Sequence, residues 1–143
     1  MKKTPNYSQL SLLADIPNSL SAVARSEKIQ ARAAEVNFDW QDVDQVIEVL
    51  KSEVIELQEA ITKQYNAHEI ITEFGDILFT RVNLARHLKT TIDDALHIAN
   101  EKFIRRFQHI ERTLQLENKN FTDLNFEQLL AYWNQAKQGT TYE

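Results

Sequence analysis

From about residue 18 onward, apolar positions recur at the spacing of amphipathic helices. The first predicted helix begins near Ser19, a suitable N-cap, and ends near Val36. Asn37 follows it, and asparagine tolerates the left-handed backbone conformation that often terminates a helix. Residues 1–18 have no clear periodicity. We therefore expect an N-terminal arm followed by a helical chain.

The same periodicity predicts four more helices. They are expected at 43–63, at 67–88, from Thr91 past Leu114, and from Asn125 to Gly139, with a polar connection at 116–124. The third predicted helix, 67–88, is apolar on several sides, as is typical of a central helix that packs on more than one neighbour. Four long helices and a short C-terminal one predict an all-α helical bundle.

Composition supports this organisation. The 143 residues contain two glycines and two prolines, and both prolines lie near the N-terminus. We expect an arm at 1–18, one domain at 19–138 and a tail at 139–143. The net charge of −5 argues against nucleic-acid binding. The chain has no cysteine, signal-peptide core or apolar run long enough for a membrane, so we expect a cytoplasmic protein without membrane contact.

Two short carboxylate pairs, Glu53-x-x-Glu56 and Glu73-x-x-Asp76, are the most informative chemical feature. The i,i+3 spacing places both members of a pair on one helix face. The sixteen residues between the pairs suffice to end one helix and begin an antiparallel one. Four converging carboxylates require a cation, and oxygen ligands favour Mg²⁺ or Mn²⁺. Chance alone yields about three such pairs in a chain of this composition, so other features must decide.

Basic residues of the fourth predicted helix supply one such feature. Lys102 and Arg106 lie at the margin and near the middle of its apolar stripe, where a cation needs a partner. The partner could be a carboxylate such as Glu53 or Glu56, or a bound phosphate. A carboxylate-held Mg²⁺, nearby cations and an aromatic side chain would together suit a nucleoside polyphosphate.

Other chemistries fit the sequence less well. The chain lacks a Walker loop, which excludes P-loop phosphate binding. A di-iron site needs Glu-x-x-His on two helices, and the nearest match is a single Asp94-x-x-His97. The four histidines share no ligand spacing. These observations leave the two carboxylate pairs as the candidate metal site.

The pairs and their surroundings resemble the MazG nucleoside triphosphate pyrophosphohydrolases of the all-α NTP pyrophosphatase superfamily. Similar runs occur at 29–34, 38–40, 73–79, 82–86, 99–107 and 133–137. The resemblance covers about 17–137 and is nearest the second half of the two-domain members. It implies an enzyme that hydrolyses a nucleoside triphosphate between the α and β phosphates, giving the monophosphate and pyrophosphate, with Mg²⁺ or alternatively Mn²⁺.

The resemblance also implies roles for particular residues. The implied metal ligands are Glu53, Glu56, Glu73 and Asp76. The implied catalytic residues are Glu53, Glu56, Lys102 and Arg106. The implied substrate contacts are Lys102, Arg106, Trp133, Lys137, Asn83 and Asn100. Trp133 could stack on the base or simply close the bundle. The implied assembly is a homodimer or a dimer-based oligomer.

Two alternatives to a general triphosphate hydrolase stay open. One is a non-catalytic nucleotide-sensing or helical interaction module that keeps the fold, and the other is a relative restricted to dUTP or dCTP. The sequence also departs from the family pattern. Ser52 and Thr72 stand where relatives often carry additional glutamates, so fewer outer carboxylates surround the metal. Gly75, between two predicted ligands, leads us to expect a close helix contact there.

Overall fold

The computed structural model describes residues 11–139, and within that range every regular element is helical. The all-α prediction is therefore confirmed. Of the predicted arm, residues 1–10 lie outside the described range, as do residues 140–143 of the predicted tail. The chain divides into two compact units, one ending at Ile92 and the other beginning at Asp93, and each is described by itself.

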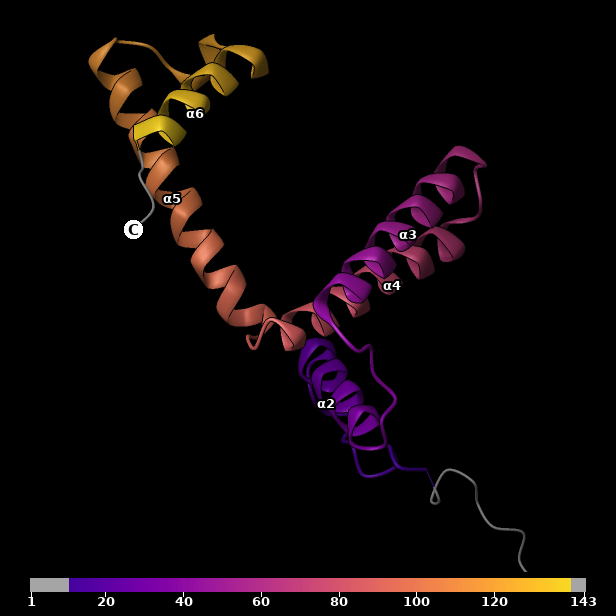
Figure 1. Cartoon of the computed structure of the whole chain (residues 1–143). Coiled ribbons are helices and arrows are strands. Elements are labelled where there is room, and N and C mark those ends of the chain that lie inside the picture. The colour runs from indigo at the N-terminus through magenta and orange to yellow at the C-terminus, as the bar shows by residue number, and fades with distance from the viewer. Residues whose placement is uncertain (1–10, 140–143) are drawn as a thin grey trace, which may run out of the picture. The chain divides into compact units, whose positions relative to one another are not determined.

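The part of the first unit from residue 11 onward is built from helices α2 (Ala22–Glu35), α3 (Val43–Thr62) and α4 (Ala67–His87), which Figure 1 labels. A short loop at 63–66 joins α3 to α4, and the two helices lie side by side as an antiparallel hairpin (Figure 1). Helix α2 packs on α4. Val46 and Ala60 of α3 and Ile77, Val82 and Ala85 of α4 are buried.

Local hydrogen bonds explain where these helices begin. The Ser21 hydroxyl accepts from the amide of Ala24 at 3.2 Å, so the first helix is capped two residues later than predicted. At the start of α4, Asn66 and Glu69 form a reciprocal capping box, with bonds of 2.9 and 3.1 Å. Such a box satisfies two amides that the first helical turn leaves unpaired.

Four helices end in the same way. In each, a residue with positive φ follows the helix, and backbone bonds close a Schellman motif, as Phe38 N to Ala33 O at 3.0 Å does after α2. The four left-handed residues are Asn37 (65°), Gln64 (55°), Lys89 (58°) and Asn118 (52°). The prediction for Asn37 is confirmed. None of the four is glycine, the residue that adopts this conformation without steric cost.

The segment before α2 is held to it by one arginine. Arg32 donates to both carboxylate oxygens of Asp15, at 2.6 and 3.1 Å, and to the carbonyl oxygen of Leu12 at 2.6 Å. The hydrogen bonds from Arg32 to the Asp15 carboxylate lower the pKa of Asp15 from its usual value. Ile16, the next residue in the chain after Asp15, is buried. Residues 11–16 thus form turns that Arg32 holds to α2 within the first unit.

The second unit contains α5 (Ile92–Leu116), a short 3₁₀ helix η1 (Phe121–Asp123) and α6 (Phe126–Gly139). The boundary between the units falls just after the first residue of α5, so the second unit begins at Asp93. Its core contains Ile110, Leu114 and Ala136, with Trp133 packed against them. Asn125 and Gln128 exchange hydrogen bonds of 2.9 Å, which confirms the predicted start of the last helix. No helix in the range 11–139 is long and apolar enough to cross a membrane.

Two expectations about packing change. A Cβ atom built on Gly75 would have no neighbour within 4 Å, so the close helix contact predicted there is wrong for the described chain. The predicted apolar stripes also continue onto exposed positions of the hairpin, including Val54, Phe74 and Leu78. Periodicity identified these as apolar faces, but it does not reveal which parts of a face are covered within one unit.

Candidate metal centre

Three predicted ligands converge on the α3–α4 hairpin. Carboxylate oxygens of Glu53 from α3 and of Glu73 and Asp76 from α4 all lie within 4.8 Å of one another. The short loop that pairs the helices places these positions opposite each other, and the i,i+3 spacing keeps Glu73 and Asp76 on one face. Glu53 and Glu73 are half-buried, whereas Asp76 is exposed. The result is a carboxylate cluster with one side open to solvent.

The electrostatics of the cluster are unfavourable without a cation. Burial raises the pKa of Glu53, and the negative charges of Glu56 and Asp76 raise it further. The pKa of Glu73 is raised by burial and by the same two neighbours. Glu56 is exposed and lies outside the closest group, but its charge acts on both half-buried glutamates. All four predicted carboxylates are therefore electrostatically coupled.

The hydrogen bonds of the cluster also indicate that it is unfavourable without a cation. Oε2 of Glu53 and Oε2 of Glu73 are buried, and neither has a hydrogen-bond partner. A buried carboxylate oxygen without a partner costs free energy, and a bound cation removes that cost. The donor set consists of oxygen atoms alone, which suits Mg²⁺ or Mn²⁺. The residues present therefore fit a divalent metal ion.

The two departures from the family pattern do not enlarge this cluster. The Ser52 hydroxyl donates to the carbonyl oxygen of Val49 at 2.8 Å, and the Thr72 hydroxyl donates to that of His68 at 2.9 Å. Both hydroxyl protons are thus used within their own helices. The acidic character of the site comes from the four carboxylates alone.

The predicted cations and aromatic residue belong to the second unit. The guanidinium of Arg106 lies 5.6 Å from the centre of the Trp133 ring, a cation–π contact, and the Phe103 ring lies 5.1 Å from the same indole. Lys102 and Asn100 are exposed on α5. Lys137 is exposed on α6, one turn after Trp133. The predicted substrate residues of this unit therefore include one packed pair, Arg106 and Trp133.

Asn83 is the predicted substrate residue that lies in the first unit. It follows Asp76 by two turns of α4, and its Oδ1 accepts from Nη2 of Arg86 at 2.8 Å. Arg86 also pairs with Asp39 at 2.6 Å, and His87 lies 3.0 Å from the same carboxylate oxygen. The sequence reasoning missed this cluster. The sequence offered one indication of it, because Asp39 is an acidic residue between two aromatic residues, Phe38 and Trp40.

Comparison with known proteins adds independent evidence. A sequence profile of the MazG nucleotide pyrophosphohydrolase domain matches residues 41–111. This chain belongs to the MazG family. The nucleoside triphosphate pyrophosphohydrolase of Escherichia coli K12 is 42% identical over 134 residues, which cover 91% of this chain and 50% of that protein. The nucleoside triphosphate pyrophosphohydrolase/pyrophosphatase MazG of Thermotoga maritima is 36% identical over 129 residues, covering 90% and 49%.

The matched MazG region contains most of the candidate site residues. It includes all four carboxylates, together with Asn83, Asn100, Lys102 and Arg106. Trp133 and Lys137 follow it in α6. The chain spans about half the length of these curated relatives. The matched MazG region therefore contains the whole acidic cluster.

Proposed function

We propose that this protein is a nucleoside triphosphate pyrophosphohydrolase. It hydrolyses the bond between the α and β phosphates and releases the nucleoside monophosphate and pyrophosphate. The observation that carries the proposal is the convergence of Glu53, Glu73 and Asp76, with two buried carboxylate oxygens lacking partners, in a MazG-family chain. The names of the Escherichia coli and Thermotoga maritima relatives support the same activity.

The four carboxylates hold Mg²⁺, with Mn²⁺ as a substitute. The bound ion supplies Lewis-acid neutralisation of the phosphate oxygens. The carboxylates of Glu53 and Glu73 lie on the half-buried side of the site. Those of Asp76 and Glu56 lie on the exposed side. A bound cation would lower the pKa values of the two glutamates, which burial and the neighbouring carboxylates raise.

Asn83 of the first unit and five residues of the second unit are the proposed substrate contacts. Lys102 and Arg106 offset the charge of the phosphates, a role suited to an exposed ammonium and a guanidinium. Asn83 and Asn100 donate hydrogen bonds, and Lys137 extends the basic surface from α6. Trp133 holds Arg106 through the cation–π contact and offers its ring to the nucleotide.

We further propose that residues 19–138 act as one domain, assembled as a homodimer or a dimer-based oligomer. The α3–α4 hairpin leaves Ile55, Ile71 and Phe74 exposed, at 55%, 65% and 49% of their surface. Apolar surface of this kind is usually covered by another element or subunit. A cytoplasmic location follows from the proposed substrates.

The experiment is a panel of the common ribo- and deoxyribonucleoside triphosphates with Mg²⁺ or Mn²⁺, assayed for pyrophosphate and monophosphate. We expect turnover that disappears in Glu53→Gln and Asp76→Asn but persists in Glu59→Gln, which changes an exposed carboxylate of the same hairpin. Turnover of dUTP or dCTP alone would identify a restricted relative. Metal-dependent nucleotide binding without turnover would identify a sensing module and contradict the proposed activity.

A further inference from the structure

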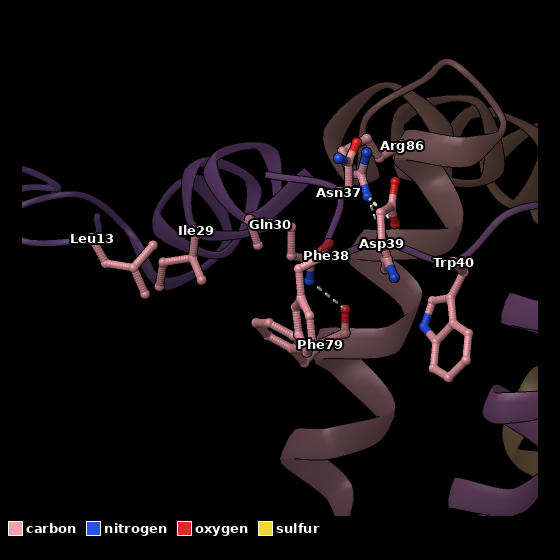
Figure 2. A pocket seen from close by; sticks show the side chains of 11 residues that line it. Leu13, Ile29, Gln30, Asn37, Phe38, Asp39, Trp40, Phe79 and Arg86 are labelled. Atoms are coloured by element: carbon pink, nitrogen blue, oxygen red, sulfur yellow. Dashed lines mark hydrogen bonds and ion pairs between the residues drawn. The ribbon is translucent and has the colours of Figure 1, made fainter. Parts of the chain in front are cut away.

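A cavity of about 450 Å³ lies in the first unit between α2, the loop at 36–42 and α4 (Figure 2). Its volume falls in the range of small-molecule sites. Among the residues to which the proposed function gives a role, Asn83, a proposed substrate contact, borders this cavity. The rest of its wall has no assigned role, so the cavity needs its own explanation.

Three aromatic side chains belong to the wall. Phe38 and Trp40 come from the loop and Phe79 from α4, and all three border the cavity (Figure 2). Their exposed fractions are large, 81%, 45% and 44%. Three exposed aromatic rings around one cavity favour a planar ligand, because aromatic faces stack on heterocyclic rings whatever their substituents.

Two residues of the wall have a buried polar atom without a hydrogen-bond partner, Gln30 at Oε1 and Arg86 at Nε. Gln30 of α2 is 6% exposed, and its Nε2 donates to the carbonyl oxygen of Phe79 at 2.8 Å (Figure 2). A carbonyl oxygen only accepts hydrogen bonds, so this bond decides which end of the amide is the nitrogen. The other end, Oε1, is buried and has no partner. Gln30 therefore brings an unsatisfied acceptor to the residues that line the cavity.

The cavity and the carboxylate cluster lie along the same helix. Phe79 follows Asp76 by three residues of α4 and Asn83 follows it by seven, positions that remain near one helix face. At 1.5 Å per residue, Asn83 is about 10 Å along the axis from Asp76. The ribose and α phosphate of a nucleotide can bridge a separation of this size, with phosphates at the carboxylates and the base at the aromatic residues.

We propose that this cavity binds the base of the nucleotide and that Gln30 determines its preference. The inference rests on the proposed function, because the phosphates define where the base lies. Gln30 Oε1 accepts a hydrogen bond from an exocyclic amino group, as in adenine or cytosine. A carbonyl at that position, as in hypoxanthine or uracil, faces Oε1 with like polarity and leaves it unpaired. The enzyme therefore prefers ATP to ITP and CTP to UTP.

The first test measures equilibrium binding of AMP and IMP by calorimetry, with kcat/KM for ATP and ITP measured in parallel on the full chain. These nucleotides differ at the relevant ring position, and the ratio within one variant is independent of the fraction of folded protein. We expect an amino preference of about tenfold. Gln30→Met should bring the ratio close to one, and Gln115→Met, which changes an exposed glutamine on α5, should leave it unchanged.

A second variant tests the aromatic wall. Trp40→Leu should weaken binding of AMP and IMP to a similar extent, because stacking does not depend on the exocyclic group. A ratio unaffected by Gln30→Met would overturn the role of Gln30. Unchanged nucleotide affinity in Trp40→Leu, together with a changed oligomeric state by size-exclusion chromatography, would show that a second copy fills the cavity instead.

The outcomes also separate this inference from the proposed function. Absence of triphosphate hydrolysis, with an AMP over IMP preference that depends on Gln30, would reject the activity and retain the base site. Hydrolysis with no base preference in binding or in kcat/KM would retain the activity and reject the role of Gln30.

Discussion

Glu53 on α3 and Glu73 on α4 bring carboxylate oxygens within 4.8 Å of each other across the hairpin, and each has a buried Oε2 without a hydrogen-bond partner. Helix packing holds these groups together although their charges repel and their desolvation is unfavourable. This arrangement therefore lowers the free energy of unfolding of the metal-free protein. That relationship leads to two measurable consequences, one with metal and one without.

Metal binding should stabilise the fold. A ligand that binds only the native state at one hundred times its dissociation constant adds about 2.7 kcal/mol to the unfolding free energy. We expect Mg²⁺ or Mn²⁺ to raise the melting temperature of the wild type measured by circular dichroism, and EDTA to reverse the rise. Glu53→Gln should lose this response, while Glu59→Gln should keep it. An equal response in both variants would remove Glu53 from the metal site.

Without metal, the same glutamate should give a characteristic pH dependence. Because the folded-state pKa of Glu53 is raised, the native state binds more protons than the unfolded state between the two pKa values. Its contribution therefore lowers stability as pH rises above about 4.3, the unfolded value. In EDTA at pH 7, Glu53→Gln should melt at a higher temperature than the wild type. The difference should shrink toward pH 4, and a lower melting temperature at pH 7 would contradict the account.

Asp39 should show the opposite pH dependence. Burial alone would raise its pKa, but hydrogen bonds from Arg86 and His87 outweigh burial and lower the pKa. A depressed pKa contributes stability above the unfolded value of about 3.9, which is lost as pH falls through the folded value. Asp39→Asn should cost about 1 kcal/mol in urea unfolding at pH 7. A cost that persists undiminished at pH 2 would show that the charge is not responsible.

Gly75 offers a test of whether something covers its helix face. A methyl group added there meets open space in the described chain, and alanine is a better helix former than glycine by about 1 kcal/mol. Gly75→Ala should therefore raise the unfolding free energy by about 0.5–1 kcal/mol. Destabilisation with a shift toward monomer in analytical ultracentrifugation would instead show that a partner subunit packs on Gly75.

The left-handed helix ends should accept glycine. Gln64 has a φ of 55°, a conformation that costs a non-glycine residue about 1 kcal/mol. Gln64→Gly should relieve most of this cost, but glycine also increases the conformational entropy of the unfolded chain. Chemical denaturation should therefore show an unfolding free energy higher by about 0.5 kcal/mol. Gln64→Ala keeps the strain and serves as the control. Equal stability of the two variants would contradict the argument.

The outline of the fold was predictable because its signals are local. Periodicity identifies α3 and α4, and the Asn125–Gln128 pair marks the start of α6. Local signals also compete, which is why Ser21 rather than Ser19 caps α2. The acidic cluster was predictable because a short loop forces antiparallel pairing of its two helices.

The cavity was not predictable, because it depends on contacts between residues far apart in sequence. Gln30 reads as an ordinary polar position of an amphipathic helix, and only its hydrogen bond to Phe79, 49 residues later, explains its burial. The Asp39–Arg86 ion pair is likewise long-range. The close helix contact expected at Gly75 was wrong for the same reason, since sequence does not reveal what faces a helix position.

The central claim is that the carboxylate cluster supports cleavage between the α and β phosphates. Phosphorus-31 NMR of a reaction containing the full chain, ATP and Mg²⁺ tests it most directly, because it identifies the bond that breaks. We predict resonances of AMP and pyrophosphate in equal amounts, which are absent with Glu53→Gln. Formation of ADP and orthophosphate, or unchanged ATP with both Mg²⁺ and Mn²⁺, would contradict the account.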